Sequence, residues 1–472
     1  MHNMIKKTKI IATIGPATAS VEMLVRLIDA GVDIFRVNFS HNSFSEHEKL
    51  IRNIRKASKH AGCSPAILQD LPGPKVRIKG LKEAREICAN SKITFSRRCQ
   101  RRNDTYLQVN YPSIFEAIKK GDPILIDDGL IRLQVVKSTP DILLCRTVVG
   151  GLLKPNKGVN FPSSSWQSPV LTVLDRKAIA FGLRHNVDFI ALSFVRDEKN
   201  LAAARRLLRR GNSKAKLIAK IERPMALDNL DQILDAADGV MVARGDLAIE
   251  TSMEKVPFLQ KEIIRKANEK NVAVIVATQM LESMTEHAVP TRAEVSDVAN
   301  AVIDGADALM LSAETAVGKH PVAAVAMMAG VIREAEQQMQ TAPGQNRSGI
   351  AQWKSLHEAI SQAALAITDN FSNNGIIIFT NNGYMARLLS KQRPAVDIFA
   401  FTANDTIMRQ LNLERGVIPF LVKLPKNEQQ LIHSVTNRLK RAGFGKQKGY
   451  WLVVWDAALI SGTSDSISVI HM

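Results

Sequence analysis

Two stretches of the chain, 215-AKLIAKIE-222 and 239-GVMVARGDL-247, decide the fold. Each begins as an apolar run with hydrophobic residues on both alternating faces, which is typical of a parallel strand that is covered on both sides. Each then ends in charged residues. The segment between them is long enough for a helix, so the pair predicts a β–α–β unit with reactive groups at the carboxyl ends of its strands.

The same pattern recurs along the chain and gives eight strands in all. The eight runs are KIIATIG (9–15), VDIFRVNFS (32–40), PAILQD (65–70), VDFIALSF (187–194), AKLIAKIE (215–222), GVMVARGDL (239–247), VAVIVATQM (272–280) and ADALMLSAET (306–315). Helical segments separate them. The segment 20–31 has Ser20 as a helix N-cap and closes on a glycine, and the segment 291–305 opens with a Thr-x-x-Glu capping box. Eight such units without a G-x-G-x-x-G motif predict an α/β fold of the (β/α)8 TIM barrel type rather than an open doubly wound sheet.

Two further domains are expected beside the barrel. Residues 76–161 contain short β-like runs with turn signals at Asp128-Gly129 and Gly150-Gly151, which predicts an all-β insertion over the barrel mouth. After the polar break 341-TAPGQNRSG-349, strands alternate with helices again. We therefore expect a catalytic barrel in residues 1–74 and 162–340, a β lid in residues 75–161, and a C-terminal α/β domain of regulatory type in residues 341–472.

Composition narrows the class of protein. The net charge of +18 favours anionic partners. The sharpest basic cluster, 97-RRCQRR-102, lacks interleaved aromatic residues, so we interpret it as a solvated face and expect neither a nucleic-acid partner nor a membrane. Four cysteines without CxxC spacing (Cys63, Cys88, Cys99 and Cys145), and no signal-like or membrane-spanning run, predict a cytoplasmic protein with reduced thiols.

Cations and carboxylates are mixed at the ends of the predicted barrel strands. Glu222 and Asp246, from neighbouring strands, are hard oxygen ligands that suit Mg²⁺. Lys220 stands two residues before Glu222, so both face the same side. A phosphoryl group would fit among Arg36, Lys220 and Arg77. Any one of these is equally well a structural ion pair, and the absence of Walker A and HExxH motifs argues against a P-loop and a zinc site.

The charged residues at the ends of the predicted barrel strands lie in segments that resemble those of the pyruvate kinase family. The segments are 13-TIGPAT-18, 36-RVNFSH-41, 70-DLPGPKVR-77, 127-DDGLI-131, 157-KGVN-160, 218-IAKIE-222, 241-MVARGDL-247, 277-ATQMLESM-284, 290-PTRAEVSDVANAV-302 and 311-LSAET-315. They occur in the family's order over roughly residues 8–330. The three-domain plan agrees with the resemblance as well.

This resemblance implies transfer of a phosphoryl group from phosphoenolpyruvate to ADP, giving pyruvate and ATP, in a homotetramer that uses Mg²⁺ or Mn²⁺. It implies that Glu222 and Asp246 hold the metal, and that Lys220 and Arg36 contact the phosphoryl group. It implies that Gly245, Asp246 and Thr278 bind the substrate carboxylate, and that Thr278 lies near the carbon that is protonated. It also implies that the nucleotide is bound by Asn38, His41, Arg77 and Lys157.

One departure from the family concerns potassium. In potassium-dependent members, an Asn, a Ser, an Asp and a Thr bind the monovalent cation, and a Glu follows five residues after that Asp. Here Asn38, Ser40 and Asp70 remain, but Leu71 replaces the Thr and Lys75 replaces the Glu. Lys75 supplies a fixed positive charge and counts among the catalytic residues. We therefore expect activity without potassium.

The C-terminal domain departs further. The segments 380-TNNGYMAR-387 and 461-SGTSDSISVIHM-472 match the family poorly, so a sugar-phosphate effector site of the usual kind is not expected. Two other functions stay open. One is a Mg²⁺-dependent barrel lyase acting on pyruvate enolate or phosphoenolpyruvate, which would need neither Lys220, nor a nucleotide, nor a lid. The other is a non-enzymatic RNA-binding protein that uses residues 97–102.

Overall fold

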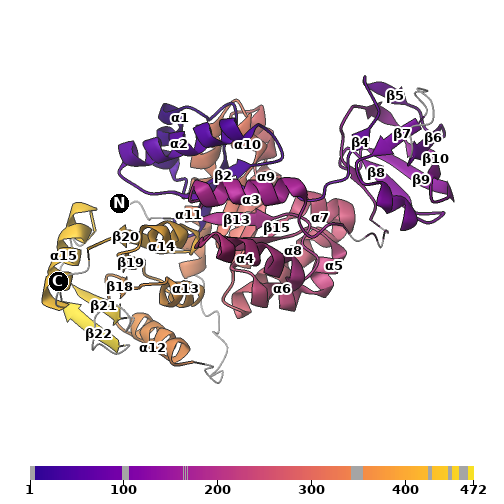
Figure 1. Ribbon diagram of the computed structural model, residues 1–472. Coiled ribbons are helices and arrows are strands. Elements are labelled where there is room, and N and C mark those ends of the chain that lie inside the picture. The colour runs from indigo at the N-terminus through magenta and orange to yellow at the C-terminus, as the bar shows by residue number, and fades with distance from the viewer. Residues whose placement is uncertain are drawn as a thin grey trace.

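The computed structural model describes residues 6–97, 106–162, 164, 166, 168–341, 355–423, 428–444, 449–455 and 466–471. Three domains follow one another in space (Figure 1). The barrel is central, the β-rich lid extends from one end of it, and the C-terminal domain lies on the opposite side. The basic cluster expected at 97–102 falls outside the described residues from position 98 onward.

The barrel is closed and parallel, with the strand order β1-β17-β16-β15-β14-β13-β3-β2. Its strands are β1 (Lys9–Thr13), β2 (Ile34–Asn38), β3 (Ala66–Asp70), β13 (Phe189–Leu192), β14 (Lys216–Ile221), β15 (Gly239–Ala243), β16 (Ala273–Ala277) and β17 (Ala308–Leu311). All eight expected strands are therefore present, and the TIM barrel is confirmed. An open sheet is excluded because β1 pairs with both β2 and β17.

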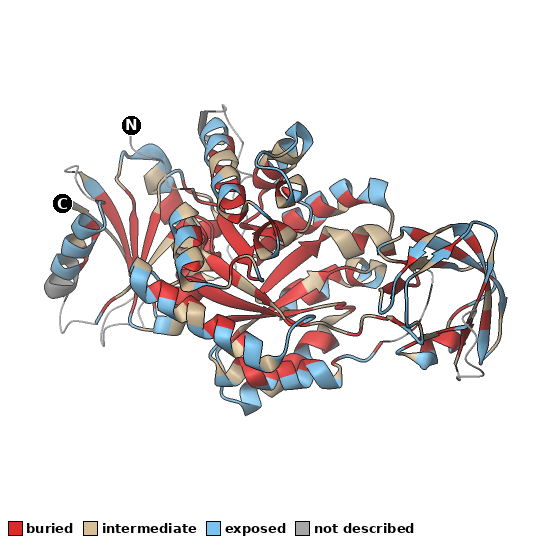
Figure 2. Cartoon of the chain, turned by 90° about the horizontal axis from the view of Figure 1, so that it is seen from above, coloured by how far each residue is buried: buried red, intermediate tan, exposed pale blue. Residues whose placement is uncertain are grey.

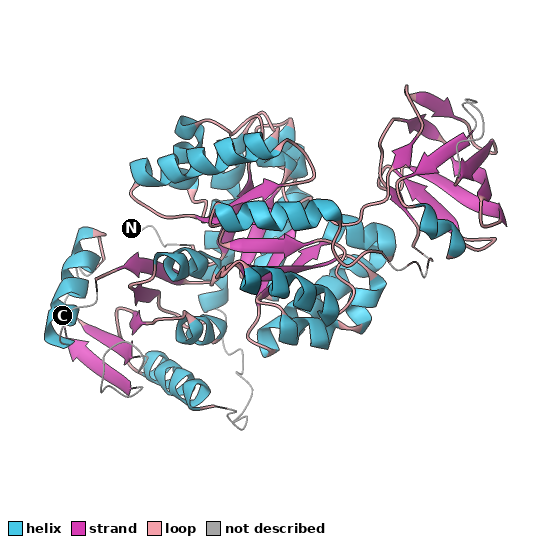
Figure 3. Ribbon diagram, viewed as in Figure 1, coloured by secondary structure: helices cyan, strands magenta, loops and turns pink. Residues whose placement is uncertain are grey.

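Helices surround the strands (Figure 3). They are α1 (Val21–Ala30), α2 (Phe44–Ala61), α3 (Val173–Arg184), α4 (Glu198–Arg210), α5 (Pro224–Asp228), α6 (Leu230–Ala236), α7 (Arg244–Glu250), the 3₁₀ helix η2 (Met253–Lys255), α8 (Val256–Glu269), η3 (Glu282–Thr285), α9 (Arg292–Asp304), α10 (Ala313–Ala316) and α11 (Pro321–Thr341). The expected caps are confirmed. Ser20 accepts from the Met23 amide at the start of α1, and Thr291 forms a capping box with Glu294 at the start of α9.

Alternate residues of each barrel strand face two different cores. In β14, Leu217, Ala219 and Ile221 pack outward against the helices, whereas Ile218 belongs to the cluster inside the barrel. Seen from above, most residues of the barrel strands are buried (Figure 2). Because the side-chain period of a strand is two, the next inward positions after Ile218 are Lys220 and then Glu222. The inner row therefore turns from apolar to charged at the carboxyl end.

Two of the expected strands end earlier than the sequence suggested. The run 239–247 leaves the sheet after Ala243, and Arg244 begins helix α7. The run 306–315 leaves after Leu311, and Ala313 begins α10. In both cases a charged side chain of the new helix binds backbone groups of the loop that follows β16. Arg244 binds the carbonyl of Thr278, and Glu314 accepts from the amides of Ser312 and Leu281.

The lid is a separate β domain between β3 and α3. Its elements are β4 (Ile78–Lys79), β5 (Arg85–Ile87), β6 (Lys92–Ser96), β7 (Tyr106–Val109), the 3₁₀ helix η1 (Pro112–Glu116), β8 (Pro123–Ile126), β9 (Ile131–Ser138), β10 (Ile142–Val149), β11 (Gly151–Leu153) and β12 (Val159–Asn160). Seven strands form a sheet in the order β12-β8-β9-β10-β6-β7-β4 around its own core. The expected turn at 127–130 is confirmed, with Asp127, Asp128 and Gly129 all at positive φ.

The C-terminal domain is an α/β sheet in the order β20-β19-β18-β21-β22. Its elements are α12 (Leu356–Asn370), β18 (Ile376–Phe379), α13 (Tyr384–Lys391), β19 (Ile398–Thr402), α14 (Asp405–Gln410), η4 (Leu411–Leu413), β20 (Val417–Leu421), α15 (Glu428–Arg441), β21 (Tyr450–Trp455) and β22 (Ser466–His471). The sequence interpretation missed β22, which pairs antiparallel with β21 in an otherwise parallel sheet.

The C-terminal domain closes the amino-terminal end of the barrel. Leu413 of η4 is 2% exposed and belongs to the cluster inside the barrel. Charged contacts surround it. Arg409 Nε lies 2.7 Å from Asp188 Oδ1, Arg415 Nη2 lies 3.3 Å from Glu336 Oε1, and Lys9 Nζ donates to the Val417 carbonyl at 2.7 Å. The two domains therefore share one core at this interface.

An acidic residue precedes every second barrel strand. Asp33, Asp188, Asp238 and Asp307 each accept a hydrogen bond from a backbone amide of the neighbouring strand: Ile10, Ile67, Leu217 and Val274 respectively. These carboxylates fix the register at the bottom of the barrel. In the part of the chain that the structure describes, no helix is long and apolar enough to cross a membrane.

Candidate active site

Lys220 is the centre of the charged residues at the carboxyl end of the barrel. Its Nζ lies 2.9 Å from Glu222 Oε1 and 3.4 Å from Asp70 Oδ1, and it donates to Ser193 Oγ at 2.8 Å. Burial alone would lower the pKa of this ammonium group, but the carboxylates of Asp70 and Glu222 outweigh burial and hold the pKa above its ordinary value. Lys220 is therefore a permanent cation.

Arg36 and Asp70 form a second fixed pair beside it. Arg36 Nε donates to Asp70 Oδ2 at 2.8 Å, Nη2 lies 2.7 Å from the same oxygen, and Nη1 donates to Thr13 Oγ1 at 3.0 Å. Asp70 is 1% exposed. Burial raises its pKa, but Lys220 and Arg36 reverse the effect and leave the pKa below its ordinary value. One carboxylate therefore positions two cations at the mouth.

Glu222 and Asp246 provide a donor set that fits a hard divalent cation. Glu222 is fully buried and accepts from the Phe194 amide at 2.6 Å through Oε2. Its Oε1 has an ion pair with Lys220 but accepts no hydrogen bond within the described residues. Burial raises the pKa of Glu222, and repulsion from Asp246 adds to the rise. A cation between the two carboxylates would relieve that repulsion, as Mg²⁺ does with oxygen ligands.

This acidic pair is small. Within the described ranges there is no group of three or more His, Cys, Asp or Glu side chains placed to hold a metal ion. Two carboxylates leave most positions around Mg²⁺ for water and for oxygens of a substrate, which is its usual arrangement at phosphoryl-transfer sites.

Thr278 stands in a strained loop that follows β16. Its φ is +72° and that of Gln279 is +52°, values that are rare for residues other than glycine. Arg244 holds the loop, because its Nη2 donates to the Thr278 carbonyl at 2.7 Å and its Nη1 to Asp297 Oδ1 at 2.8 Å. Thr278 Oγ1 accepts from the Gly245 amide at 2.9 Å. These hydrogen bonds hold the strained loop and place the hydroxyl at the start of α7.

Comparison with known proteins agrees with this geometry. The family described as pyruvate kinase, barrel domain, matches residues 5–325, and the one described as pyruvate kinase, alpha/beta domain, matches residues 358–470. The chain belongs to the pyruvate kinase family.

Individual relatives agree over nearly the whole chain. "Pyruvate kinase 2" of Synechocystis is 40% identical, over 99% of this chain and 79% of the relative. The pyruvate kinase of Thermotoga maritima is 37% identical, over 99% of this chain and all of the relative. The crystal structure of a pyruvate kinase from Cryptosporidium parvum superposes with a TM-score of 0.91 at 32% identity, covering 99% and 96% of the two chains. The fold and the enzyme class follow from these matches.

The residues expected at a monovalent-cation site have partners within the chain. Asn38 Oδ1 accepts from the Ser40 amide at 3.1 Å, and Asp70 binds Arg36 and Lys220. Leu71 is 2% exposed, and its carbonyl accepts from Ser193 Oγ. Lys75 Nζ reaches Asp246 Oδ1 at 3.2 Å rather than Asp70. The lysine therefore contacts the acidic pair.

Of the four residues expected at the nucleotide, His41 and Arg77 lie near each other, whereas Lys157 has a partner in the lid. Burial lowers the pKa of His41, and Arg77, Arg36 and Lys75 lower it further, so these three cations lie near the imidazole. Arg77 Nη1 donates to the Asn156 carbonyl in the lid at 3.1 Å. Lys157 is held by Asp127, 2.7 Å away on the lid turn.

Several residues of this site were not given roles by the sequence interpretation. Ser193 accepts from Lys220, Arg244 clamps the Thr278 loop, and Glu314 holds the amides of Leu281 and Ser312. All three stand at or just after the carboxyl ends of barrel strands. That position was the available signal, but the roles depend on contacts between distant strands.

Proposed function

We propose that this pyruvate kinase family member transfers the phosphoryl group of phosphoenolpyruvate to ADP, giving pyruvate and ATP, and that it does so without a potassium requirement. The observation that carries the proposal is the placement of Lys220. A buried ammonium group is held charged between Asp70 and Glu222 and stands beside Arg36. Two fixed cations next to an acidic pair suit a phosphoryl group in transfer, because that reaction depends on positioning and charge neutralisation.

The acid pair supports the metal part of the proposal. Glu222 and Asp246 would hold Mg²⁺, with Mn²⁺ as a substitute. When bound, the metal supplies positive charge at the oxygens of the substrate. The chain's own cations supply the remaining positive charge. Lys220 and Arg36 neutralise the phosphoryl oxygens, and Lys75 balances Asp246.

The start of α7 and the Thr278 loop would bind the substrate carboxylate. Gly245 carries no side chain, so a substrate group can approach the backbone at the start of α7 closely. The backbone amide of Asp246, in the first turn of α7, would contact the same group. Thr278 Oγ1, which now accepts from the Gly245 amide, would orient the proton donor for the enolate carbon.

Asn38, His41, Arg77 and Lys157 would contact the nucleotide. Arg77 and Lys157 belong to the lid side of the hinge, whereas His41 follows β2 of the barrel. Closing the lid onto a nucleotide would therefore bring the two sets together and exclude water from the phosphoryl group. We also propose the domain limits given above, a cytoplasmic location and a homotetramer.

The potassium part of the proposal rests on Leu71 and Lys75. Leu71 offers no side-chain oxygen to a cation, and it is buried. Lys75 brings a positive charge to within 3.2 Å of Asp246. The lyase alternative is not favoured, since it accounts for neither the lid nor the Lys220 cluster. The RNA-binding alternative leaves the whole barrel mouth unexplained.

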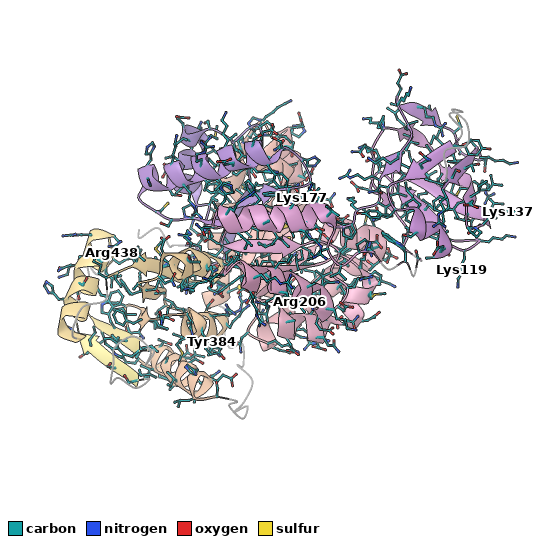
Figure 4. All side chains as sticks on the ribbon, in the orientation of Figure 1. Lys119, Lys137, Lys177, Arg206, Tyr384 and Arg438 are labelled. Carbon is teal, nitrogen blue, oxygen red and sulfur yellow. The ribbon has the colours of Figure 1, made fainter. Side chains whose placement is uncertain are left out.

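The test is pyruvate formation from phosphoenolpyruvate and ADP, followed by coupling to lactate dehydrogenase. We expect turnover by the native chain and a loss of about 10²–10³-fold in Lys220→Ala, as for removal of one preorganised group that binds transition-state charge. Lys177→Ala is the matched control, because Lys177 is exposed on α3 of the same barrel (Figure 4). No pyruvate from the native chain would overturn the proposal.

A further inference from the structure

A cavity of about 230 Å³ lies beside the candidate active site, where the lid joins the barrel. It is walled by η1 and β12 of the lid, by the segments that follow β13 and β14, and by the end of α7. The lining residues that matter are Arg196, Arg223 and Glu250 among the charged side chains and Ile114, Phe161 and Met225 among the apolar ones. Lys75 lines the same cavity while its ammonium group contacts Asp246.

Arg196 and Arg223 line this cavity without an ion pair among the described residues. Arg196 is 8% exposed, and Arg223 Nε is buried without a hydrogen-bond partner. The Arg223 guanidinium lies 5.0 Å from the centre of the Phe194 ring. Among the described residues, no carboxylate forms an ion pair with either side chain, and no hydrogen bond reaches either guanidinium.

Other buried arginines do have such partners. Arg409 pairs with Asp188, Arg415 with Glu336, and Arg387 with Glu414 at 3.2 Å. A buried charge without a partner is unfavourable unless an anion completes it. The carboxylate of Glu250 lies near Arg223, but neither guanidinium group has an ion pair, so both remain available to an anion that is not part of the chain.

The other residues that line the cavity limit the charge and the polarity of this anion. Glu250 also lines the cavity, where its Oε1 accepts from Asn160 Nδ2 at 2.7 Å, and Asp228 adds a second carboxylate. These two acids offset two of the three cations that line the cavity, Arg196, Arg223 and Lys75, so the lining favours one negative charge over a dianion such as a phosphate ester. Most of the other lining residues are apolar, Ile114, Phe161 and Met225 among them, so the body of the ligand is apolar too. A cavity of roughly 150 Å³ accepts a benzene ring, and the larger volume here accommodates a ring with a short acidic arm.

We propose that this cavity binds a small monocarboxylate with an apolar, ring-sized body, its carboxylate between Arg196 and Arg223. The site joins lid and barrel, since Ile114 and Asn160 belong to the lid and Arg223 belongs to the barrel. A ligand here favours one position of the lid over others and acts on the neighbouring active site through Lys75. Linkage requires the converse as well, so substrates that close the lid change the affinity of the cavity.

Phenylacetate is a suitable probe, with the neutral 2-phenylethanol and the dianionic benzyl phosphate beside it. Isothermal titration of the full chain should give saturable phenylacetate binding with a Kd of about 1 mM or tighter, which ligand efficiency allows for so small a molecule. We expect both other probes to bind at least about tenfold more weakly. Absence of saturable phenylacetate binding, or tighter binding of benzyl phosphate, would overturn the proposal.

Variants decide where the probe binds. Arg223→Met keeps an apolar side chain over Phe194 and should weaken phenylacetate binding about tenfold or more. Arg206→Met is the matched control, because Arg206 is exposed on α4 away from the lid (Figure 4). Met225→Trp fills the cavity without a change of charge and should also abolish binding. Thermal unfolding of each variant separates lost binding from lost folding.

The active site itself is the competing location, because it is also expected to bind a carboxylate. Lys220→Ala should leave phenylacetate binding within about twofold of native. Binding that is lost in Lys220→Ala but retained in Arg223→Met would place the probe in the active site and refute the cavity. In the native chain, phenylacetate should change the KM for phosphoenolpyruvate, and this effect should disappear in Met225→Trp.

Discussion

Lys75 Nζ, at the base of the lid, lies 3.2 Å from Asp246 Oδ1 in the first turn of α7. The contact joins residues that are 171 positions apart and belong to different domains. It places a fixed positive charge beside one of the two carboxylates of the proposed metal site. Lys75 is therefore positioned to influence the electrostatics of the mouth and the position of the lid at the same time.

Reversing this charge should create a potassium requirement. Native turnover in tetramethylammonium buffer should be within about twofold of that with potassium, whereas Lys75→Glu should gain about tenfold or more on addition of potassium, equivalent to about 1.4 kcal/mol of barrier. Lys79→Glu, an exposed position in β4, is the control and should show no such gain. A large activation of the native chain by potassium would contradict the prediction that Lys75 makes potassium unnecessary.

Glu222 should be needed for metal affinity independently of turnover. Glu222→Gln removes one of two charged ligands, so Mn²⁺ affinity measured by electron paramagnetic resonance should fall about tenfold or more. Glu254→Gln, an exposed change near α8, should leave the affinity unchanged. Equal Mn²⁺ binding by both variants would mean that the metal lies elsewhere.

The hydroxyl of Thr278, rather than its shape, should matter for catalysis. Thr278→Val keeps the branched side chain at φ +72° but cannot accept from the Gly245 amide, so kcat should fall about 10²-fold or more. Thr278→Ser retains the hydroxyl and should stay close to native. If the two variants were equally active, the loop strain alone would explain the position.

Leu413 should stabilise the barrel from the C-terminal domain. Leu413→Ala opens a cavity in the inner cluster and should destabilise by about 2–5 kcal/mol, which thermal unfolding would show as a lowered Tm. Leu356→Ala makes the same change at a position that is 65% exposed and should cost less than about 0.5 kcal/mol. A native-like Tm for Leu413→Ala would show that the two domains unfold independently.

Lys7 should make stability rise with pH in a defined window. Burial lowers the pKa of Lys7 from 10.5 to about 8 in the folded chain. Between these values the unfolded chain binds the extra proton, so the Lys7 contribution to stability is unfavourable below pH 8 and improves up to pH 10.5. The change is at most on the order of 3 kcal/mol.

The measurement is the difference in Tm between native and Lys7→Met from pH 7 to pH 10.5, the span that includes both values. The Tm of the native chain should rise relative to the Tm of Lys7→Met as the pH rises. Lys119→Met, at an exposed lysine of the lid, should show no trend (Figure 4). A difference that stays constant with pH would mean that Lys7 keeps its proton throughout.

Much of the barrel was predictable because its elements are local patterns. Hydrophobic runs predicted the eight strands, and capping residues such as Ser20 and Thr291 predicted where helices begin. The spacing of Lys220 and Glu222 predicted that both face the mouth, since alternate residues of a strand share a face. The acidic residue before every second strand, as at Asp188, was present in the sequence but carried no recognisable meaning until its amide partner was seen.

The sequence by itself determined the strands, the order of the domains and which residue types stand at the barrel mouth, because each depends on neighbours in the chain. Only the tertiary structure decided their partners. It brought Lys75 to Asp246, placed Leu413 inside the barrel, and gathered Arg196, Arg223 and Glu250 around one cavity. These contacts depend on how separate strands and domains pack against one another. The spacing of residues along the sequence does not specify the distance between side chains on different strands or domains.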